Sequence, residues 1–173
     1  MNSAAVAVPV QSAHAVEHED VAARCDVTTL ITASTATDVE HLARRIHAAS
    51  ARAACAFVQA SAAALPVEAG ALLETCAGLI DAAAGGTLFL TAVEEMPTSA
   101  QDRFIETFAR LQSIRDSSVA VRLMAGTSVS LRERIAEVAF SERLFYRLNI
   151  IHVLKDEPTP RNAARKRRRP VVS

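Results

Sequence analysis

Short, continuous apolar runs alternate along this chain with longer stretches in which apolar residues recur at helical spacing. A continuous apolar run between turn residues is typical of a strand that is buried on both faces of a parallel sheet. We expect such strands at residues 27–32, 55–60, 87–93, 119–125 and 149–154. Helices are expected from about residue 38 to 49 and at 67–84, 99–113 and 130–138. This alternation of strand and helix predicts the α/β class.

The stretch from Gly85 to Pro97 is the centre of this pattern. Paired glycines precede the apolar run Thr87–Val93, and Pro97 closes the turn after it. Two helix starts are marked by their residues as well. Ser99 is expected to be an N-cap, and Ser130-Leu131-Arg132-Glu133 has the pattern of a capping box.

The letters of the central stretch resemble the Walker B strand in the AAA+ domain of the bacterial enhancer-binding proteins, the activators of sigma-54 RNA polymerase. The family reads GGTLFLDEI there, and this chain reads GGTLFLTAV. The metal-binding Asp and the catalytic Glu of the family therefore fall on Thr91 and Ala92. The resemblance extends to residues 30–47, where LITASTATDVEHLARRIH stands in place of LITGESGTGKELVARAIH without a gap.

This second segment departs from the family in the residues that bind phosphate. A P-loop needs glycines, so that backbone N–H groups can face phosphate oxygens, and a Lys that meets their charge. Ala33, Ala36 and Asp38 occupy the glycine positions, and Val39 occupies the Lys position. The degenerate nucleotide-binding positions are thus Ala36, Thr37, Asp38, Val39 and Glu40. A strand-to-helix turn capped by Thr37 or Asp38 explains this loop better than a phosphate cradle.

Further segments resemble the family in the same order along the chain. The family's sensor Asn falls on Ser128, and residues 140–149 are similar to FREDLYYRLN, which supplies two arginine fingers to the ATP of a neighbouring subunit. The first finger position is Ser141, and the second is retained as Arg147, for which an ion pair with a nearby carboxylate is the structural alternative. The GAFTGA loop that contacts sigma-54 has no counterpart in residues 67–84.

The resemblance implies a three-layer α/β sandwich around a five-stranded parallel sheet, an AAA+ or P-loop NTPase-like core with strand order 5-1-4-3-2. Residues 25–154 are expected to form this degenerate sigma-54-interaction-like domain, lacking the helical lid that follows it in the family. Residues 1–24 are expected to be a flexible N-terminal arm, and residues 155–173 a disordered basic tail.

Two functions fit these residues. The first is a transcription-regulation domain that has lost ATP hydrolysis, because the Lys and both acidic residues are replaced. Such a pseudo-ATPase would act by protein association, with intact sigma-54 activator subunits as candidate partners. The alternative is a weak ATP-binding protein or ATPase whose carboxylates come from Glu94 and Glu95. No cofactor is expected in the first case, and ATP with Mg²⁺ enters only through the resemblance.

Charge and cysteine content change this picture little. The tail carries the run Arg165, Lys166, Arg167, Arg168 and Arg169, which can attract nucleic acid without sequence preference.

Cys25, Cys55 and Cys76 lack metal or redox spacing, and neither a signal peptide nor a membrane-spanning run is evident, so a reduced cytoplasmic protein is expected. The letters His14–His18 spell H-x-x-E-H, but a solvated helix explains them better than a zinc site.

Overall fold

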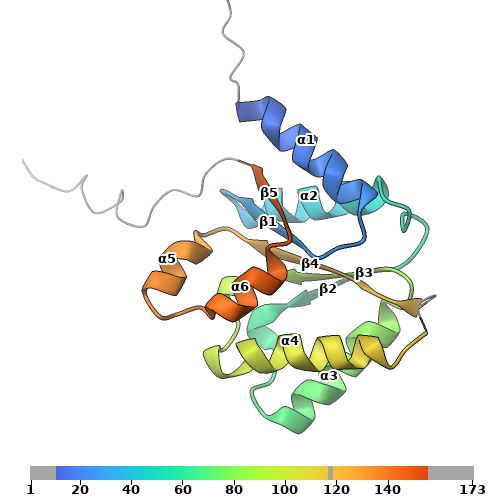
Figure 1. The fold of residues 1–173 in the computed structure, drawn as a ribbon, viewed down its shortest axis with the longest axis vertical. Helices are drawn as coiled ribbons and strands as arrows, with labels where there is room; N and C mark the ends of the chain where they lie inside the picture. Colours follow the sequence, from blue (N-terminus) through green and yellow to red (C-terminus); the bar gives the residue numbers. More distant parts are fainter. Residues whose placement is uncertain (1–10, 117–118, 156–173) are drawn as a thin grey trace, which may run out of the picture.

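The computed structural model describes residues 11–116 and 119–155, which form a three-layer α/β sandwich (Figure 1). Five parallel strands make the middle layer. They are β1 (Thr29–Ala33), β2 (Phe57–Ser61), β3 (Thr87–Thr91), β4 (Arg122–Thr127) and β5 (Ile151–Lys155). Their order across the sheet is β2-β3-β4-β1-β5, which confirms the predicted order 5-1-4-3-2 when it is read from the opposite edge.

Helices cover both faces of this sheet (Figure 1). One face carries α1 (Gln11–Arg24) and α2 (Ala36–Ala48), and the other carries α3 (Ala69–Ala82), α4 (Thr98–Ser113) and α6 (Glu142–Leu148). The short helix α5 (Leu131–Ala136) follows β4, and the 3₁₀ turns η1 (Ala62–Ala64) and η2 (Val93–Glu95) follow β2 and β3. Helices on alternate faces are what right-handed crossovers between parallel strands produce.

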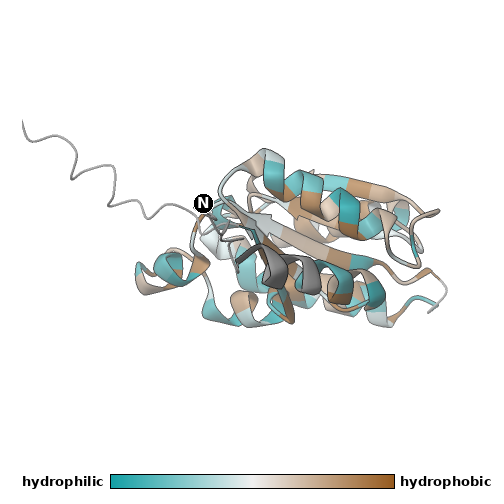
Figure 2. Cartoon of the chain, turned by 90° about the horizontal axis from the view of Figure 1, so that it is seen from above, coloured by the Kyte–Doolittle hydropathy of each residue, from teal (hydrophilic) through white to brown (hydrophobic). Residues whose placement is uncertain are grey.

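Strand alternation divides the core into two clusters, one on each face of the sheet. The cluster beneath α2 includes Ile31, Leu42, Ile46, Phe89 and Met124. The larger cluster on the opposite face includes Leu72, Leu88, Leu90, Phe104 and Leu144. Figure 2 shows the corresponding pattern, with mixed teal and brown helices on both sides of paler or brown strands. The central strands β1, β3 and β4 are therefore buried on both faces, whereas the edge strands β2 and β5 are partly exposed.

Helix α1 corrects the expectation of a flexible arm for residues 11–24, and residues 1–10 of that arm lie outside the described residues. Residues Gln11–Arg24 are helical, and the helix packs against the sheet through Ala22 and Ala23, which are buried. An ion pair of 2.7 Å between Glu19 and Arg45 joins α1 to α2. The two small alanines allow close approach of the helix, so residues 11–24 pack on the domain instead of forming a free arm.

The helix starts agree with the sequence in one case and differ in two. Ser130 caps α5, and its hydroxyl accepts a hydrogen bond from the Glu133 N–H at 3.3 Å, as predicted. Helix α4 begins at Thr98, so Pro97 occupies the N-cap and Ser99 lies within the first turn. Helix α2 is capped by Thr35 instead of Thr37 or Asp38, because α2 already begins at Ala36.

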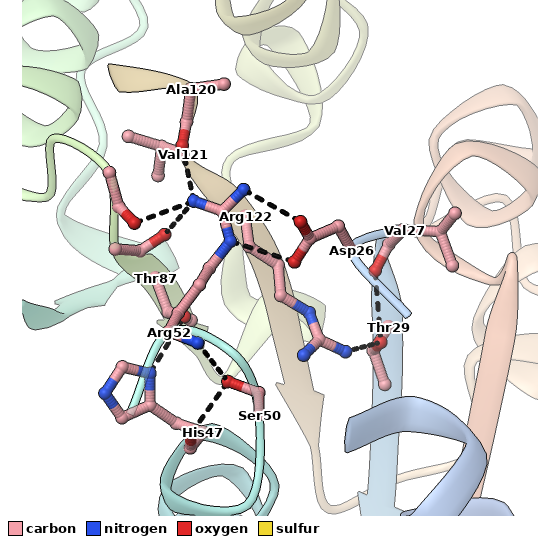
Figure 3. Close-up of polar contacts among 12 residues, drawn as sticks. Asp26, Val27, Thr29, His47, Ser50, Arg52, Thr87, Ala120, Val121 and Arg122 are labelled. Carbon is pink, nitrogen blue, oxygen red and sulfur yellow. Dashed lines mark hydrogen bonds and ion pairs between the residues drawn. The ribbon is translucent and has the colours of Figure 1, made fainter. Parts of the chain in front are cut away.

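Arg52 connects several loops at the amino end of the sheet through hydrogen bonds (Figure 3). No role for this residue was predicted from the sequence. Its Nη1 donates to three backbone carbonyls, those of Gly85, Gly86 and Ala120, at 2.8, 3.3 and 2.6 Å. Its Nε and Nη2 donate to the two carboxylate oxygens of Asp26. This hydrogen bonding to Arg52 holds the pKa of Asp26 below its usual value. One guanidinium thus fixes loops that are far apart in the sequence.

A second arginine, Arg122, lies in β4 and is only 1% exposed. Its Nη2 donates to the Ala22 carbonyl at 2.5 Å. The same Nη2 donates to the Thr29 hydroxyl at 3.0 Å (Figure 3). Its Nε and Nη1 have no hydrogen-bond partner among the described residues. Burial lowers the pKa of Arg122, and the charge of nearby Asp26 acts in the opposite direction. The guanidinium consequently joins α1, β1 and β4 at this end of the sheet.

Candidate functional site

A cavity of about 260 Å³ lies at the carboxyl ends of β3 and β4, next to the start of α2. Open α/β sheets place ligand sites at this edge. The lining residues come from four separate segments: Ala36, Thr37, Val39, Glu40, Gln59, Thr91, Ala92, Glu94, Gly126, Thr127 and Ser128. The fold therefore places the degenerate P-loop positions other than Asp38 beside the degenerate Walker B positions and the sensor position.

Two backbone N–H groups at the start of α2, those of Asp38 and Val39, bond within the chain. Thr35 accepts from the Asp38 N–H through its hydroxyl at 3.1 Å and from the Val39 N–H through its carbonyl at 3.1 Å. In a P-loop, N–H groups at this place cradle a phosphate. Only Ser34 and Thr35 separate β1 from α2, so the connection is a capped turn and not an extended cradle.

The Asp38 carboxylate lies at the positive end of the α2 dipole. It accepts a hydrogen bond from the Thr35 hydroxyl at 2.7 Å and forms an ion pair with Lys155, whose Nζ lies 2.9 Å from Asp38 Oδ1. The hydrogen bonds from Thr35 and Lys155 hold the pKa of Asp38 below its usual range, so the group remains ionised at neutral pH. Asp38 does not line the cavity, so its carboxylate serves the start of α2 and the contact with β5.

Val39, at the Lys position, is part of the core. It is 4% exposed and belongs to the cluster that contains Phe89. The gap between Val39 and β4 is closed, because a Cβ added to Gly126 would lie 2.4 Å from Val39 Cγ1. At the position where the family has a phosphate-binding Lys, this chain therefore packs an aliphatic side chain against β3 and β4.

The Walker B positions offer no carboxylate at the end of β3. The Thr91 hydroxyl donates to the Ala60 carbonyl at 3.4 Å, and Ala92 adopts the left-handed conformation with φ 49°. The turn that follows places Glu94 in the cavity, where Oε1 accepts long hydrogen bonds of 3.4 and 3.5 Å from the N–H and hydroxyl of Ser128. Glu95 is exposed and does not line the cavity. One of the two alternative carboxylates thus reaches the site.

The charges around the cavity do not suit a polyphosphate. Its lining residues include Glu40 and Glu94 but no Lys, Arg or His. Arg44 donates to Glu40 at 2.8 Å, and this bond holds the pKa of Glu40 below its usual value. Because like charges repel and none of the lining cations needed for phosphate is present, this cavity favours neutral or cationic groups over ATP.

The remaining predicted residues lie elsewhere. Arg147 is exposed on α6, outside the cavity, and forms no ion pair within the described part of the chain. Its neighbour Arg143 pairs with Glu106 at 2.7 Å. Residues 165–169 of the tail lie outside the described residues, as does the side chain of His14. Within residues 11–116 and 119–155, no cluster of three potential metal ligands occurs, and no helix has the length and hydrophobicity to cross a bilayer.

The strand order, the three layers and the position of the cavity define an AAA+ domain of the P-loop NTPase fold. The chain belongs to the sigma-54 interaction domain family, whose model matches residues 7–154. It is 37% identical over 139 residues to the nitrogen assimilation regulatory protein NtrX of Azorhizobium caulinodans, a match that covers 72% of this chain and 31% of the relative. It is 33% identical over 148 residues to the DNA-binding transcriptional regulator NtrC of Escherichia coli, covering 75% and 32%.

Solved structures support the same assignment. NtrX from Brucella abortus in complex with ATP superposes with a TM-score of 0.67 at 25% identity, over 88% of this chain and 38% of that chain. The P-loop NTPase domain of a sigma-54 activator from E. coli shares the fold, with a TM-score of 0.63 at 18% identity over 89% and 99%. The chain spans about a third of the length of the curated relatives described above.

Proposed function

We propose that this chain is a sigma-54 activator-type regulator that does not hydrolyse ATP and acts by protein association. The observation that carries the proposal is the buried Val39, which fills space against Phe89 and Gly126 at the position of the phosphate-binding Lys. The ion pair of Asp38 with Lys155 and the absence of a carboxylate at Thr91 and Ala92 support it. Phosphate binding, metal binding and water activation each lack their usual side chain.

Titration with Mg-ATP tests the first half of the proposal. We expect no saturable heat up to about 1 mM nucleotide, because Thr35 already accepts the Asp38 and Val39 N–H groups and no cation lines the cavity. Isothermal titration calorimetry makes the measurement, and NtrX from B. abortus, which was crystallised with ATP, is the positive control. A micromolar affinity that changes with substitutions within residues 36–40 would contradict the proposal.

A weak ATPase is the second candidate, and Glu94 is the observation that favours it. Its carboxylate lines the cavity and contacts Ser128, the sensor position. Slow but measurable phosphate release would support this alternative. To establish it, Glu94→Gln must abolish the release and Glu95→Gln must leave it unchanged. Glu95 is the matched control because it is exposed and lies outside the cavity.

The proposed association uses the outer side of α6 and the residues that follow it. Tyr146 is 66% exposed and Ile150 is 59% exposed, and Arg147 lies between them in the sequence. Exposed aromatic, aliphatic and Arg side chains are typical of protein interfaces. The resemblance implies that this segment faces a neighbouring subunit, so an intact activator of the same family is the proposed partner.

Mixing experiments test the association. We expect this chain to lower the ATPase rate of a full-length sigma-54 activator from the same organism, because it would occupy a subunit edge without completing a working site. The double variant Tyr146→Ala/Arg147→Ala should lose the inhibition, whereas Arg110→Ala, an exposed residue of α4, should retain it. Phe145 is unsuitable for this test because it is buried in the core.

Steady-state ATPase rates and sedimentation velocity at tens of micromolar provide the two readouts. An unchanged rate together with unchanged sedimentation would refute association with activator subunits. Inhibition that survives the double variant would place the contact on another surface.

A further inference from the structure

A second cavity of about 260 Å³ lies on the opposite side of the sheet, between the carboxyl ends of β1 and β5 and the helices α5 and α6. Its lining residues are Leu30, Thr32, Val129, Ser130, Leu131, Arg132, Glu133, Phe145, His152 and Leu154. None of them lines the cavity beside α2. This second cavity is therefore a separate candidate site, which the function proposed above does not use.

The walls of the second cavity are mainly apolar. Leu30, Leu131 and Phe145 are buried and belong to the larger core cluster, and Leu154 is 37% exposed. Apolar walls that hold a few converging polar groups are typical of small-molecule sites. At roughly 30 Å³ for each water-sized group, the space suits a compound of about nine non-hydrogen atoms.

The polar groups of the second cavity are arranged asymmetrically. His152 lies on β5 beside Thr32 of β1, with 2.9 Å between His152 Nε2 and the Thr32 hydroxyl oxygen. Burial lowers the pKa of His152, so its ring is neutral at neutral pH. Arg132 is exposed, and its guanidinium lies 6.0 Å from the centre of the Phe145 ring. The sheet side of the cavity is thus uncharged, and the charges belong to α5.

Arg132 is available to an outside anion. It forms no ion pair with any described residue, although Glu133 follows it on α5. Adjacent residues of a helix point about 100° apart, so Glu133 is poorly placed to neutralise Arg132. A guanidinium held over an aromatic ring can present two N–H groups to a carboxylate.

We propose that the second cavity binds a small organic carboxylate. The apolar body of the ligand would contact Leu30, Leu131 and Phe145, and its carboxylate would pair with Arg132. The neutral His152 and Thr32 offer a hydrogen-bonding pair to a further polar atom on the ligand. Such a site would let a small acid regulate a chain whose nucleotide cavity is unsuited to ATP. The existence of the site does not depend on the association proposed above.

Titrations with three compounds of one shape test this proposal. Benzoate, benzyl alcohol and benzylamine are titrated into the full chain at pH 7.5 and followed by isothermal titration calorimetry and by ligand-observed NMR. We expect benzoate to bind with a dissociation constant on the order of 1 mM or tighter and about fivefold more tightly than benzyl alcohol. Benzylamine should bind no better than the alcohol.

Substitutions locate the binding. Arg132→Gln should reduce the affinity for benzoate to that for benzyl alcohol and leave the alcohol unaffected, and Leu154→Asp should weaken both compounds. Arg110→Gln removes an exposed cation of α4 and should change neither affinity. Circular dichroism of each variant separates loss of binding from loss of folding.

Three results would overturn the proposal. The first is that neither benzoate nor the linear acid hexanoate binds saturably at about 10 mM. The second is that Arg132→Gln, in a folded variant, leaves benzoate binding unchanged. The third is a preference for benzylamine, which would mean that Glu133 governs the site.

Discussion

Replacement of Gly86 with alanine is expected to lower the free energy of unfolding by about 4 kcal/mol or more, which is enough to unfold many small domains. A Cβ at this position would lie 2.0 Å from the carbonyl oxygen of Ala56 and 2.9 Å from its carbon and nitrogen. These are backbone atoms at the entry to β2, and the same carbonyl accepts the Thr87 N–H at 2.8 Å. The clash therefore cannot relax by a rotamer change. Urea unfolding followed by circular dichroism makes the measurement.

Gly78→Ala is the matched control for this clash. Gly78 lies inside α3, and a Cβ there would meet no atom within 4 Å. Alanine is favoured over glycine in a helix interior, so this variant should gain up to about 1 kcal/mol of stability. Equal stability of the Gly86 and Gly78 variants would contradict the close contact between Gly86 and the Ala56 carbonyl.

Replacement of Arg52 with methionine should have the second largest effect, a loss of about 3 kcal/mol. Methionine retains much of the apolar stem but leaves the Gly85, Gly86 and Ala120 carbonyls without their shared donor, and Asp26 without its partner. The affected groups join three loops at the amino end of the sheet (Figure 3). Chemical denaturation of the variant and the parent chain measures the difference.

Arg44→Met is the matched control for Arg52. Arg44 is also a guanidinium with a carboxylate partner, Glu40, but its side chain is 54% exposed. Exposed ion pairs of this kind contribute little to stability, so its effect should be small beside that of Arg52. Equal effects of the two variants would show that the carbonyl contacts of Arg52 do not stabilise the fold.

The strands could be predicted from the sequence because burial on both faces leaves a plain apolar signal. Thr87–Thr91 is such a run, and β3 occupies it. Strand order came from the resemblance and not from the pattern, since pairing depends on contacts between distant segments. The apolar run at 119–125 predicted β4 but not its bounds, because Arg122 opens the strand at Arg122–Thr127 and an arginine in a core is uncommon.

The resemblance assigned positions to a nucleotide site, but it could not supply the contacts that these residues make. Alignment of letters placed Val39 and Asp38 at the phosphate loop, and the structure brings Val39 to the cavity. The sequence could not identify Thr35 as the N-cap of α2, because Ser34, Thr35 and Thr37 all have side chains that can cap a helix. The partner of Asp38 is Lys155, 117 residues further along the chain, and only the pairing of β1 with β5 brings them together.

The contact of Ala22 with Arg122 changes where this domain begins. A boundary drawn from sequence motifs starts at residue 25, just before the first strand. The buried guanidinium, however, takes a main-chain acceptor from α1, and Ala22 and Ala23 fill space beside β5 and α2. We therefore expect the folded domain to include α1, so that a proteolytic cut after Arg24 would remove part of its core.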